Sequence, residues 1–423
     1  MEPLRSPGPF LRQGSNMHAS SPHPAPATPW LAIFAGLCAS LVSIGLARFA
    51  YTPLIPSLIE AHWFAEAQVV YLGAANLAGY LIGALVGHPL ARRWSNTTVL
   101  RWMLMGVTLS FFACAWPIST PWFFAWRLLS GIAGGAIMVL VAATVLPHVP
   151  AARRGLASGA IFMGVGVGIA ASGTLVPALL RFGLQATWLG LGGLALLLTA
   201  LSWFGWPAPH REAAASHIRM PGNPALRLLF GQYALMAAGL VPAMVFLVDY
   251  IARGLGAGTH EAALVWMFYG LGAIVGPMVY GALADHMGAR PAIRLVLIAQ
   301  AAAVAVLPLA QAFWLLAIVA VVIGSFPPGI VPLALARVHE LCPNHAQQQV
   351  AWSRATVSFA SFQALSGITY SVIFNATGGQ YRLLFGIASA VLVLAWLAQE
   401  VATRWPVRAS DVPPGTASPV RGQ

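Results

Sequence analysis

Two arginines, Arg48 and Arg127, lie inside long apolar stretches of this 423-residue chain. A guanidinium is a planar fork of five N–H donors, and it binds carboxylates through two parallel hydrogen bonds. No Asp or Glu occurs between Glu66 and Glu212, so the apolar stretches around both arginines contain no carboxylate. Because an isolated charge in an apolar medium is costly, each arginine needs a partner.

Three kinds of partner are open for these guanidinium groups. Backbone carbonyls and water are the first, Asp249 in the second half of the chain is the second, and an anionic solute is the third. Arg127 can alternatively tether its own helix, and Arg48 can extend its charged end out of the apolar stretch toward water. If the partner is an anionic solute, the two arginines form a binding site for a small organic anion.

Asp249 is the acidic residue that lies well inside the apolar stretches of the second half. A carboxylate in such apolar surroundings is rare and can take up and release a proton, so Asp249 is our candidate for a proton-carrying group. The alternative is an ion pair with Arg253, which follows one helical turn later.

The elements that position these residues follow from composition. The chain is 59% hydrophobic and 8% charged, with a mean hydropathy of +0.77, whereas a soluble domain carries about 25% charged residues. A membrane-spanning helix needs ~20 apolar residues. We predict an all-α integral membrane protein with twelve spans at 31–57, 68–89, 98–116, 121–145, 155–180, 186–206, 225–252, 261–283, 292–310, 313–336, 348–374 and 381–403.

Polar, proline-rich segments divide the chain into two halves. We predict a disordered cytoplasmic tail over 1–29, a six-helix bundle over 30–206, a linker over 207–224, a second six-helix bundle over 225–404 and a second tail over 405–423. The halves repeat at an offset of 283 − 90 = 193 residues, which aligns two pairs of glycines: Gly79 with Gly272 and Gly83 with Gly276. Glycines four apart let neighbouring helices approach closely.

The net charge of +12 lies mostly in alternate loops and at both ends of the chain. Such asymmetry predicts cytoplasmic termini and a multi-pass protein of the bacterial inner membrane. We therefore expect a lipid bilayer and not nucleic acid as the partner of this charge, and we expect a monomer. Scattered histidines and three cysteines without metal-like spacing predict no metal, no cofactor and no enzyme activity.

One polar loop, Gly281-Ala-Leu-Ala-Asp-His-Met-Gly-Ala-Arg290, has the form of a known motif. It resembles the Gly-x-Leu-Ala-Asp-Arg-x-Gly-x-Arg loop that joins the second and third helices of each half of major facilitator superfamily (MFS) transporters. In the first half, Arg92 replaces the Asp and Ser95 replaces the Gly. The resemblance implies a cytoplasmic gate composed of Gly281, Asp285, Gly288, Arg290 and Arg92, with Asp285 paired to Arg153 or Arg154.

Further motifs support this resemblance along most of the chain. Arg127-Leu-Leu-Ser-Gly resembles the Arg-x-x-x-Gly element of the fourth span, and Gly164-x-x-x-Gly168 resembles a fifth-span motif associated with antiporters. In the latter, Ile169 stands where the motif has proline. The segment Gly45-Leu-Ala-Arg48-Phe-Ala-Tyr51 is similar to the first helix of the poorly characterised YbfB/YjiJ-like branch.

The resemblance implies two pseudo-symmetric six-helix bundles that carry a small organic solute by alternating access, with the site between them. The paired arginines favour an anionic solute, and Asp249 suggests proton coupling. An exporter of drugs or metabolites with the same fold is the alternative, and a membrane sensor that transports nothing is a further one. Our candidates for binding the solute are Arg48, Tyr51, Asn76, Arg127, Gln232 and Gln363.

Overall fold

The computed structural model describes residues 29–150, 153–208, 223–342 and 345–404. Both predicted tails, apart from Pro29, and most of the predicted linker lie outside the described residues. The described residues form helices and turns without a β-strand. Twelve helical segments among these residues are long and apolar enough to cross a membrane. The predicted all-α, twelve-span fold class is therefore confirmed.

Four consecutive elements form the first span, and single long helices form most of the others. The elements are α1 (Pro29–Ser40), η1 (Leu41–Leu46), η2 (Phe49–Leu54), α2 (Ile55–Glu60), α3 (Glu66–Trp94), α4 (Asn96–Cys114), α5 (Thr120–Val145), η3 (Leu146–His148), α6 (Arg154–Leu180), α7 (Leu184–Ser202), α8 (Pro224–Asp249), η5 (Tyr250–Gly254), α9 (Gly258–Met287), α10 (Ala289–Val306), η6 (Leu307–Leu309), α11 (Phe313–Leu341), α12 (His345–Ala376) and α13 (Tyr381–Arg404).

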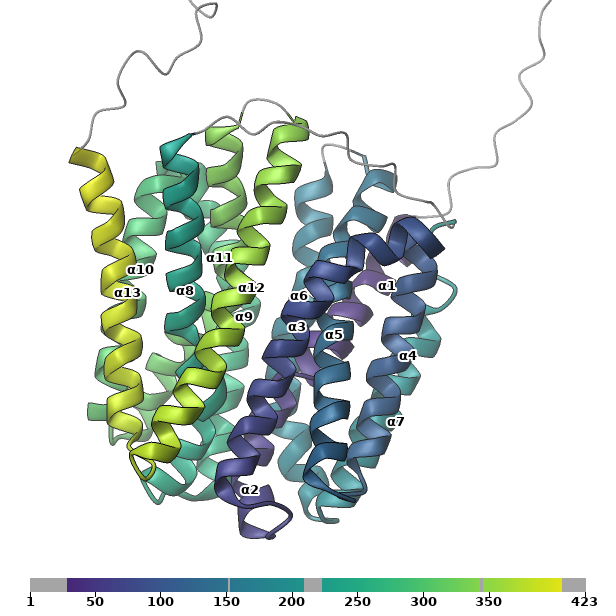
Figure 1. The fold of residues 1–423 in the computed structure, drawn as a ribbon, viewed down its shortest axis with the longest axis vertical. Coiled ribbons are helices and arrows are strands. Elements are labelled where there is room, and N and C mark those ends of the chain that lie inside the picture. The colour runs from purple at the N-terminus through teal and green to yellow at the C-terminus, as the bar shows by residue number, and fades with distance from the viewer. Residues whose placement is uncertain (1–28, 151–152, 209–222, 343–344, 405–423) are drawn as a thin grey trace, which may run out of the picture.

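The helices of the first half gather on one side of the molecule and those of the second half on the other (Figure 1). We call them the N-half (α1–α7) and the C-half (α8–α13). The first span begins and α13 ends at the same end, drawn at the top of Figure 1, which we call the terminal end. The other end, where α2 lies, is the opposite end.

The glycines aligned by the repeat pack the same pair of helices in each half. A Cβ placed on Gly79 or Gly83 of α3 would collide with the backbone of α5. One placed on Gly272 or Gly276 of α9 would collide with the backbone of α11. The second and fourth spans of each half thus approach through glycine, as small residues allow in membrane helices.

The turns at the two copies of the polar loop also match. Ser95 (φ 84°, ψ 150°) ends α3 and precedes α4, and Gly288 (φ 84°, ψ 156°) ends α9 and precedes α10. This backbone conformation is natural for glycine and strained for serine. The first copy therefore keeps the turn although it has lost the glycine.

Replacing Ser95 by glycine is expected to stabilise the protein by about 1 kcal/mol. The substitution relieves roughly 1–3 kcal/mol of backbone strain. It loses the Ser95 hydroxyl, which accepts a hydrogen bond from the Thr98 N–H at 3.3 Å, but glycine at such a cap costs only about a few tenths of a kcal/mol. Thermal unfolding in detergent measures the difference. Ser95→Ala keeps the strain and loses the cap, so its midpoint should fall; a lower midpoint for Ser95→Gly would contradict the argument.

Candidate functional site

The first span is interrupted where Arg48 lies. It passes from the π-helix η1 to a turn at Ala47 and Arg48 and then to the 3₁₀-helix η2. Pro53 lies inside η2 and has no N–H, so it cannot continue an α-helical hydrogen-bond ladder. Switches among π, α and 3₁₀ geometry in one helix often mark functional sites. At the break the Arg48 N–H still donates to the Ile44 carbonyl at 3.3 Å, but no described backbone N–H donates to the Ala47 carbonyl.

Close packing against α6 holds this break in place. A Cβ on Gly45 would lie 2.8 Å from the Gly168 Cα and 3.1 Å from the Gly164 carbonyl oxygen. The Gly164-x-x-x-Gly168 pattern thus lets α6 approach the first span just before Arg48. The first and fifth spans meet here without side chains between them.

Replacing Gly45 by alanine is expected to destabilise the protein by about 1–3 kcal/mol, because the added methyl overpacks two helix backbones. Thermal unfolding and the yield of monodisperse protein measure the loss. Gly193→Ala in α7 is the matched control, since nothing lies within 4 Å of a Cβ there and alanine favours a helix. Equal stability of both variants would contradict the close approach.

Arg48 is held by residues from both halves. Its Nε donates to Asn76 Oδ1 of α3 at 3.3 Å, and its Nη1 donates to Gln363 Oε1 of α12 at 3.0 Å. The guanidinium carbon lies 4.1 Å from the centre of the Tyr80 ring. Asn76 and Gln363 are buried, whereas Arg48 is partly exposed. Within the described residues no carboxylate pairs with Arg48.

Arg127 has a different environment, inside the N-half. It is 3% exposed, and its Nη1 donates to the Ala47 carbonyl at 2.5 Å. Its guanidinium lies 4.2 Å from the centre of the Tyr51 ring, and the Tyr51 hydroxyl donates to the Val69 carbonyl at 2.7 Å. Arg127 therefore joins α5 to the carbonyl left free at the break.

Asn76 connects the two arginines. Its Nδ2 donates to the Ser130 hydroxyl at 2.9 Å and to the Arg127 carbonyl at 3.4 Å, while its Oδ1 accepts from Arg48. Both ends of one amide are thus used, which fixes its orientation. We call Arg48, Asn76, Tyr80 and Gln363 the Arg48 cluster.

The six predicted solute-binding residues do not form one set. Arg48, Asn76 and Gln363 come together, and Tyr51 and Arg127 pack behind them. Gln232 does not join them: its Nε2 donates to Gln399 Oε1 at 2.8 Å and to the Ala395 carbonyl at 3.1 Å, both on α13. Its amide thus joins two helices of the C-half, and its place among the solute ligands stays a prediction. Helical spacing alone did not show which neighbour it faces.

Asp249 belongs to a charge cluster that joins the two halves at the opposite end. The fully buried carboxylate accepts from Arg253 at 2.6 and 2.9 Å and from the Tyr381 hydroxyl at 2.5 Å. Arg253 also pairs with Glu66, at the start of α3, at 2.5 Å. We call Glu66, Asp249, Arg253 and Tyr381 the gate cluster. The ion pair considered from the sequence is present, and Tyr381, from a helix 132 residues away, completes it.

Further hydrogen bonds between the halves lie toward the same end. The Thr52 hydroxyl of η2 donates to the Met244 carbonyl of α8 at 2.7 Å. The Trp266 indole N–H of α9 donates to the Ser172 hydroxyl of α6 at 3.0 Å. With the Arg48–Gln363 bond and the Glu66–Arg253 pair, these contacts hold the opposite end together.

At the terminal end the predicted latch contact with Arg153 is not made in this conformation. Asp285 is exposed and forms no hydrogen bond or ion pair with a described residue, and Arg153 is exposed as well. The Arg154 side chain lies outside the described residues. Arg92 is exposed, Gly281 and Arg290 are partly exposed, and Gly288 forms the turn. An acid that the sequence analysis missed, Glu340, accepts from the Ala289 N–H at 2.9 Å and pairs with Arg337.

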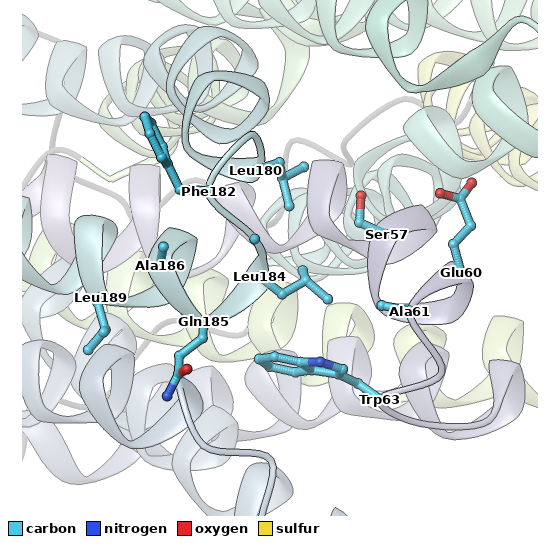
Figure 2. Close-up of a pocket in the computed structure, with 11 residues that line it drawn as sticks. Ser57, Glu60, Ala61, Trp63, Leu180, Phe182, Leu184, Gln185, Ala186 and Leu189 are labelled. Carbon is cyan, nitrogen blue, oxygen red and sulfur yellow. The ribbon is translucent and has the colours of Figure 1, made fainter.

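A separate open hollow of about 860 Å³ lies at the opposite end, between α2 and the turn from α6 to α7. Figure 2 shows Trp63 and Glu60 on one side and Phe182 and Leu184 on the other. Its lining comes from the N-half and contains no residue of the Arg48 cluster. The site predicted from the sequence is therefore distinct from this hollow.

Solved structures of other proteins share this architecture. The D-xylose–proton symporter matches with a TM-score of 0.67 at 16% identity, over 88% of this chain and 96% of that one. A partially occluded, inward-open form of the xylose transporter XylE from E. coli matches with a TM-score of 0.70 at 13% identity, over 90% and 100%. Twelve spans in two halves, with an interrupted first span at their interface, define the chain as a protein of the MFS fold.

Within that class, residues 40–400 match the family described as "Uncharacterised MFS-type transporter YbfB". The chain belongs to this family, as the resemblance of its first span implied. The family and the first two relatives named below are described as transporters and not as enzymes.

Curated relatives match over parts of their length. The gallate transporter of Pseudomonas putida is 27% identical over 55% of this chain and 61% of that protein. The 4-hydroxybenzoate transporter PcaK of Acinetobacter baylyi is 31% identical over 44% and 41%. The chloramphenicol resistance protein of Streptomyces lividans is 24% identical over 60% and 67%. The chain thus spans about two fifths to two thirds of the length of these relatives.

Proposed function

We propose that this protein is a secondary carrier for a small aromatic carboxylate and that Arg48 binds the carboxylate group. The Arg48 cluster carries this proposal. It places a cation between the two halves, on a broken span, with two neutral amides and an aromatic ring around it and no acid paired to it among the described residues. A carboxylate supplies the missing charge through stronger, charge-assisted hydrogen bonds.

The Tyr80 ring favours an aromatic solute. A solute ring beside it would make offset or edge-to-face contacts, which contribute roughly 0.5–1.5 kcal/mol per pair. The gallate and 4-hydroxybenzoate transporters among the relatives have aromatic acids in their names and thus support the same class.

We further propose that the terminal end faces the cytoplasm of a bacterial cell and that the carrier is a monomer. The alternate placement of arginines supports this orientation. The opposite end, held together by the gate cluster, then faces the periplasm, and the described conformation is inward-facing. The Asp285 latch stays a prediction for a conformation in which the cytoplasmic end is closed.

Asp249 remains our candidate for proton coupling, now as part of the gate cluster. Protonating this carboxylate would weaken its two bonds to Arg253 and so favour opening of the opposite end. Coupling through this residue predicts that a pH gradient drives uptake and that Asp249→Asn removes the dependence on the gradient while counterflow continues.

Uptake into vesicles tests the function. Purified protein in proteoliposomes is expected to exchange labelled 4-hydroxybenzoate with internal unlabelled 4-hydroxybenzoate, and not with 4-hydroxybenzyl alcohol, which lacks the carboxylate. A gradient-driven efflux of chloramphenicol without exchange of any carboxylate would instead favour the drug exporter, the alternative that one relative suggests. Binding without exchange would favour a sensor.

A further inference from the structure

The hydrogen bond between Arg48 and Gln363 joins two residues that are 315 positions apart, one from each half. Gln363 Oε1 is a neutral acceptor, and the structure gives its Nε2 no hydrogen bond to a described residue. The Arg48 Nη2 likewise has none. The bond therefore provides an acceptor for the cation but leaves its charge uncompensated.

We propose that the Gln363 amide oxygen binds Arg48 at the place where the solute carboxylate binds, and that the arriving solute displaces Gln363. This inference rests on the proposed function, because it takes a carboxylate as the solute group. Gln363 is then a positioning residue that competes with the solute, and it is not a ligand of the solute.

The geometry of a guanidinium supports displacement. A carboxylate bound through two parallel bonds uses either Nε with Nη2 or Nη1 with Nη2. Asn76 holds Nε and Gln363 holds Nη1. Asn76 is fixed, since its own amide nitrogen donates to Ser130 at 2.9 Å. Gln363 has no such second bond, so it is the neighbour that gives way.

Displacement would link solute binding to movement of the halves. Gln363 lies on α12, and Gly367, one turn further along this helix, packs against Leu77 next to Asn76. Loss of the Arg48–Gln363 bond frees α12 from the first span at this point. In the empty carrier, Gln363 thus takes the place of the solute on Arg48 and links the two halves. Binding of the solute breaks this link.

Two substitutions of Gln363 test the inference with 4-hydroxybenzoate as the probe. Gln363→Met keeps the length of the side chain and removes the competing oxygen, so the probe should bind about 3- to 10-fold tighter, since breaking a hydrogen bond to a charged group no longer opposes it. Gln363→Glu places a carboxylate on Arg48, so binding should weaken at least about 10-fold and the thermal midpoint without the probe should rise. Gln300→Met, at a buried glutamine of α10 whose amide bonds only to other residues of the C-half, should leave the affinity unchanged.

Weaker or unchanged binding by Gln363→Met, with binding by the wild type intact, overturns displacement and makes Gln363 a direct ligand or a bystander. Failure of the proposed function gives a different pattern, in which neither the wild type nor any variant binds 4-hydroxybenzoate. In that case the thermal measurement still decides: an unchanged or lower midpoint for Gln363→Glu overturns the inference.

Discussion

Replacing Arg48 by alanine is expected to reduce uptake of 4-hydroxybenzoate about 100-fold or more while the protein still folds. The variant removes the cation that we propose binds the solute carboxylate, and truncating one partner of a hydrogen-bonded charge pair costs about 2–5 kcal/mol. Folding survives because the partners of Arg48 are neutral amides, which the partly exposed site lets water satisfy.

The variant Arg48→Lys shows how much of the effect comes from the positive charge and how much from the planar shape of the guanidinium. Lysine keeps the positive charge but lacks the planar fork that matches a carboxylate, so uptake should lie between that of the wild type and that of Arg48→Ala. Arg227→Ala, at an exposed position of α8, is the control for a general loss of positive charge. Uptake at the wild-type rate by Arg48→Ala, with an unchanged thermal midpoint, would remove Arg48 from the solute site.

Replacing Arg253 by methionine is expected to destabilise the protein by about 3–5 kcal/mol, because the substitution leaves a buried carboxylate without its cation. Asp249 is fully buried and would keep only the Tyr381 hydroxyl. The thermal midpoint should fall, and adding Asp249→Asn should restore most of it, since an amide in that place carries no charge.

The gate cluster also predicts that breaking the pair between the halves lets the opposite end of the molecule open. Glu66→Gln breaks the pair that joins the halves, at a cost of about 0–1 kcal/mol because Glu66 is 46% exposed. The fold should therefore survive while this end opens more often. A cysteine introduced at Thr52, which is buried beside Met244, should react faster with a membrane-impermeant thiol reagent in Glu66→Gln.

The native cysteines are buried and are removed for this measurement. Arg337→Gln, which breaks an ion pair within the C-half at the terminal end, is the matched control. Equal labelling of the Thr52 position with and without Glu66→Gln would show that the gate cluster does not hold this end closed.

The sequence predicted the spans because a bilayer imposes a length and a polarity on every helix that crosses it. It also predicted the repeat, since the same glycines are needed wherever two helices of each half touch: Gly79 and Gly83 in one, Gly272 and Gly276 in the other. Ser95 shows the limit of a motif. It stands where the motif has glycine, yet the backbone keeps the same turn.

The partners of the candidate residues could not be predicted in the same way. Arg127 and Arg48 looked alike in the sequence, each a lone cation in an apolar span. In the structure Arg127 donates to the Ala47 carbonyl inside the N-half, whereas Arg48 donates to the amide of Gln363 in the C-half. Gln232 and Gln363 looked alike as well, and only one reaches Arg48.

By itself, the sequence determined that this chain is a twelve-span MFS protein with an arginine, and no acid, in the middle of its first span. These properties are local, since they depend on the length, polarity and order of neighbouring residues. The tertiary structure decided which residues meet that arginine, and that Asp249, Arg253, Glu66 and Tyr381 form one cluster. Side-chain contacts across two six-helix halves depend on how helices rotate and tilt against each other, and a single helical sequence does not encode that angle.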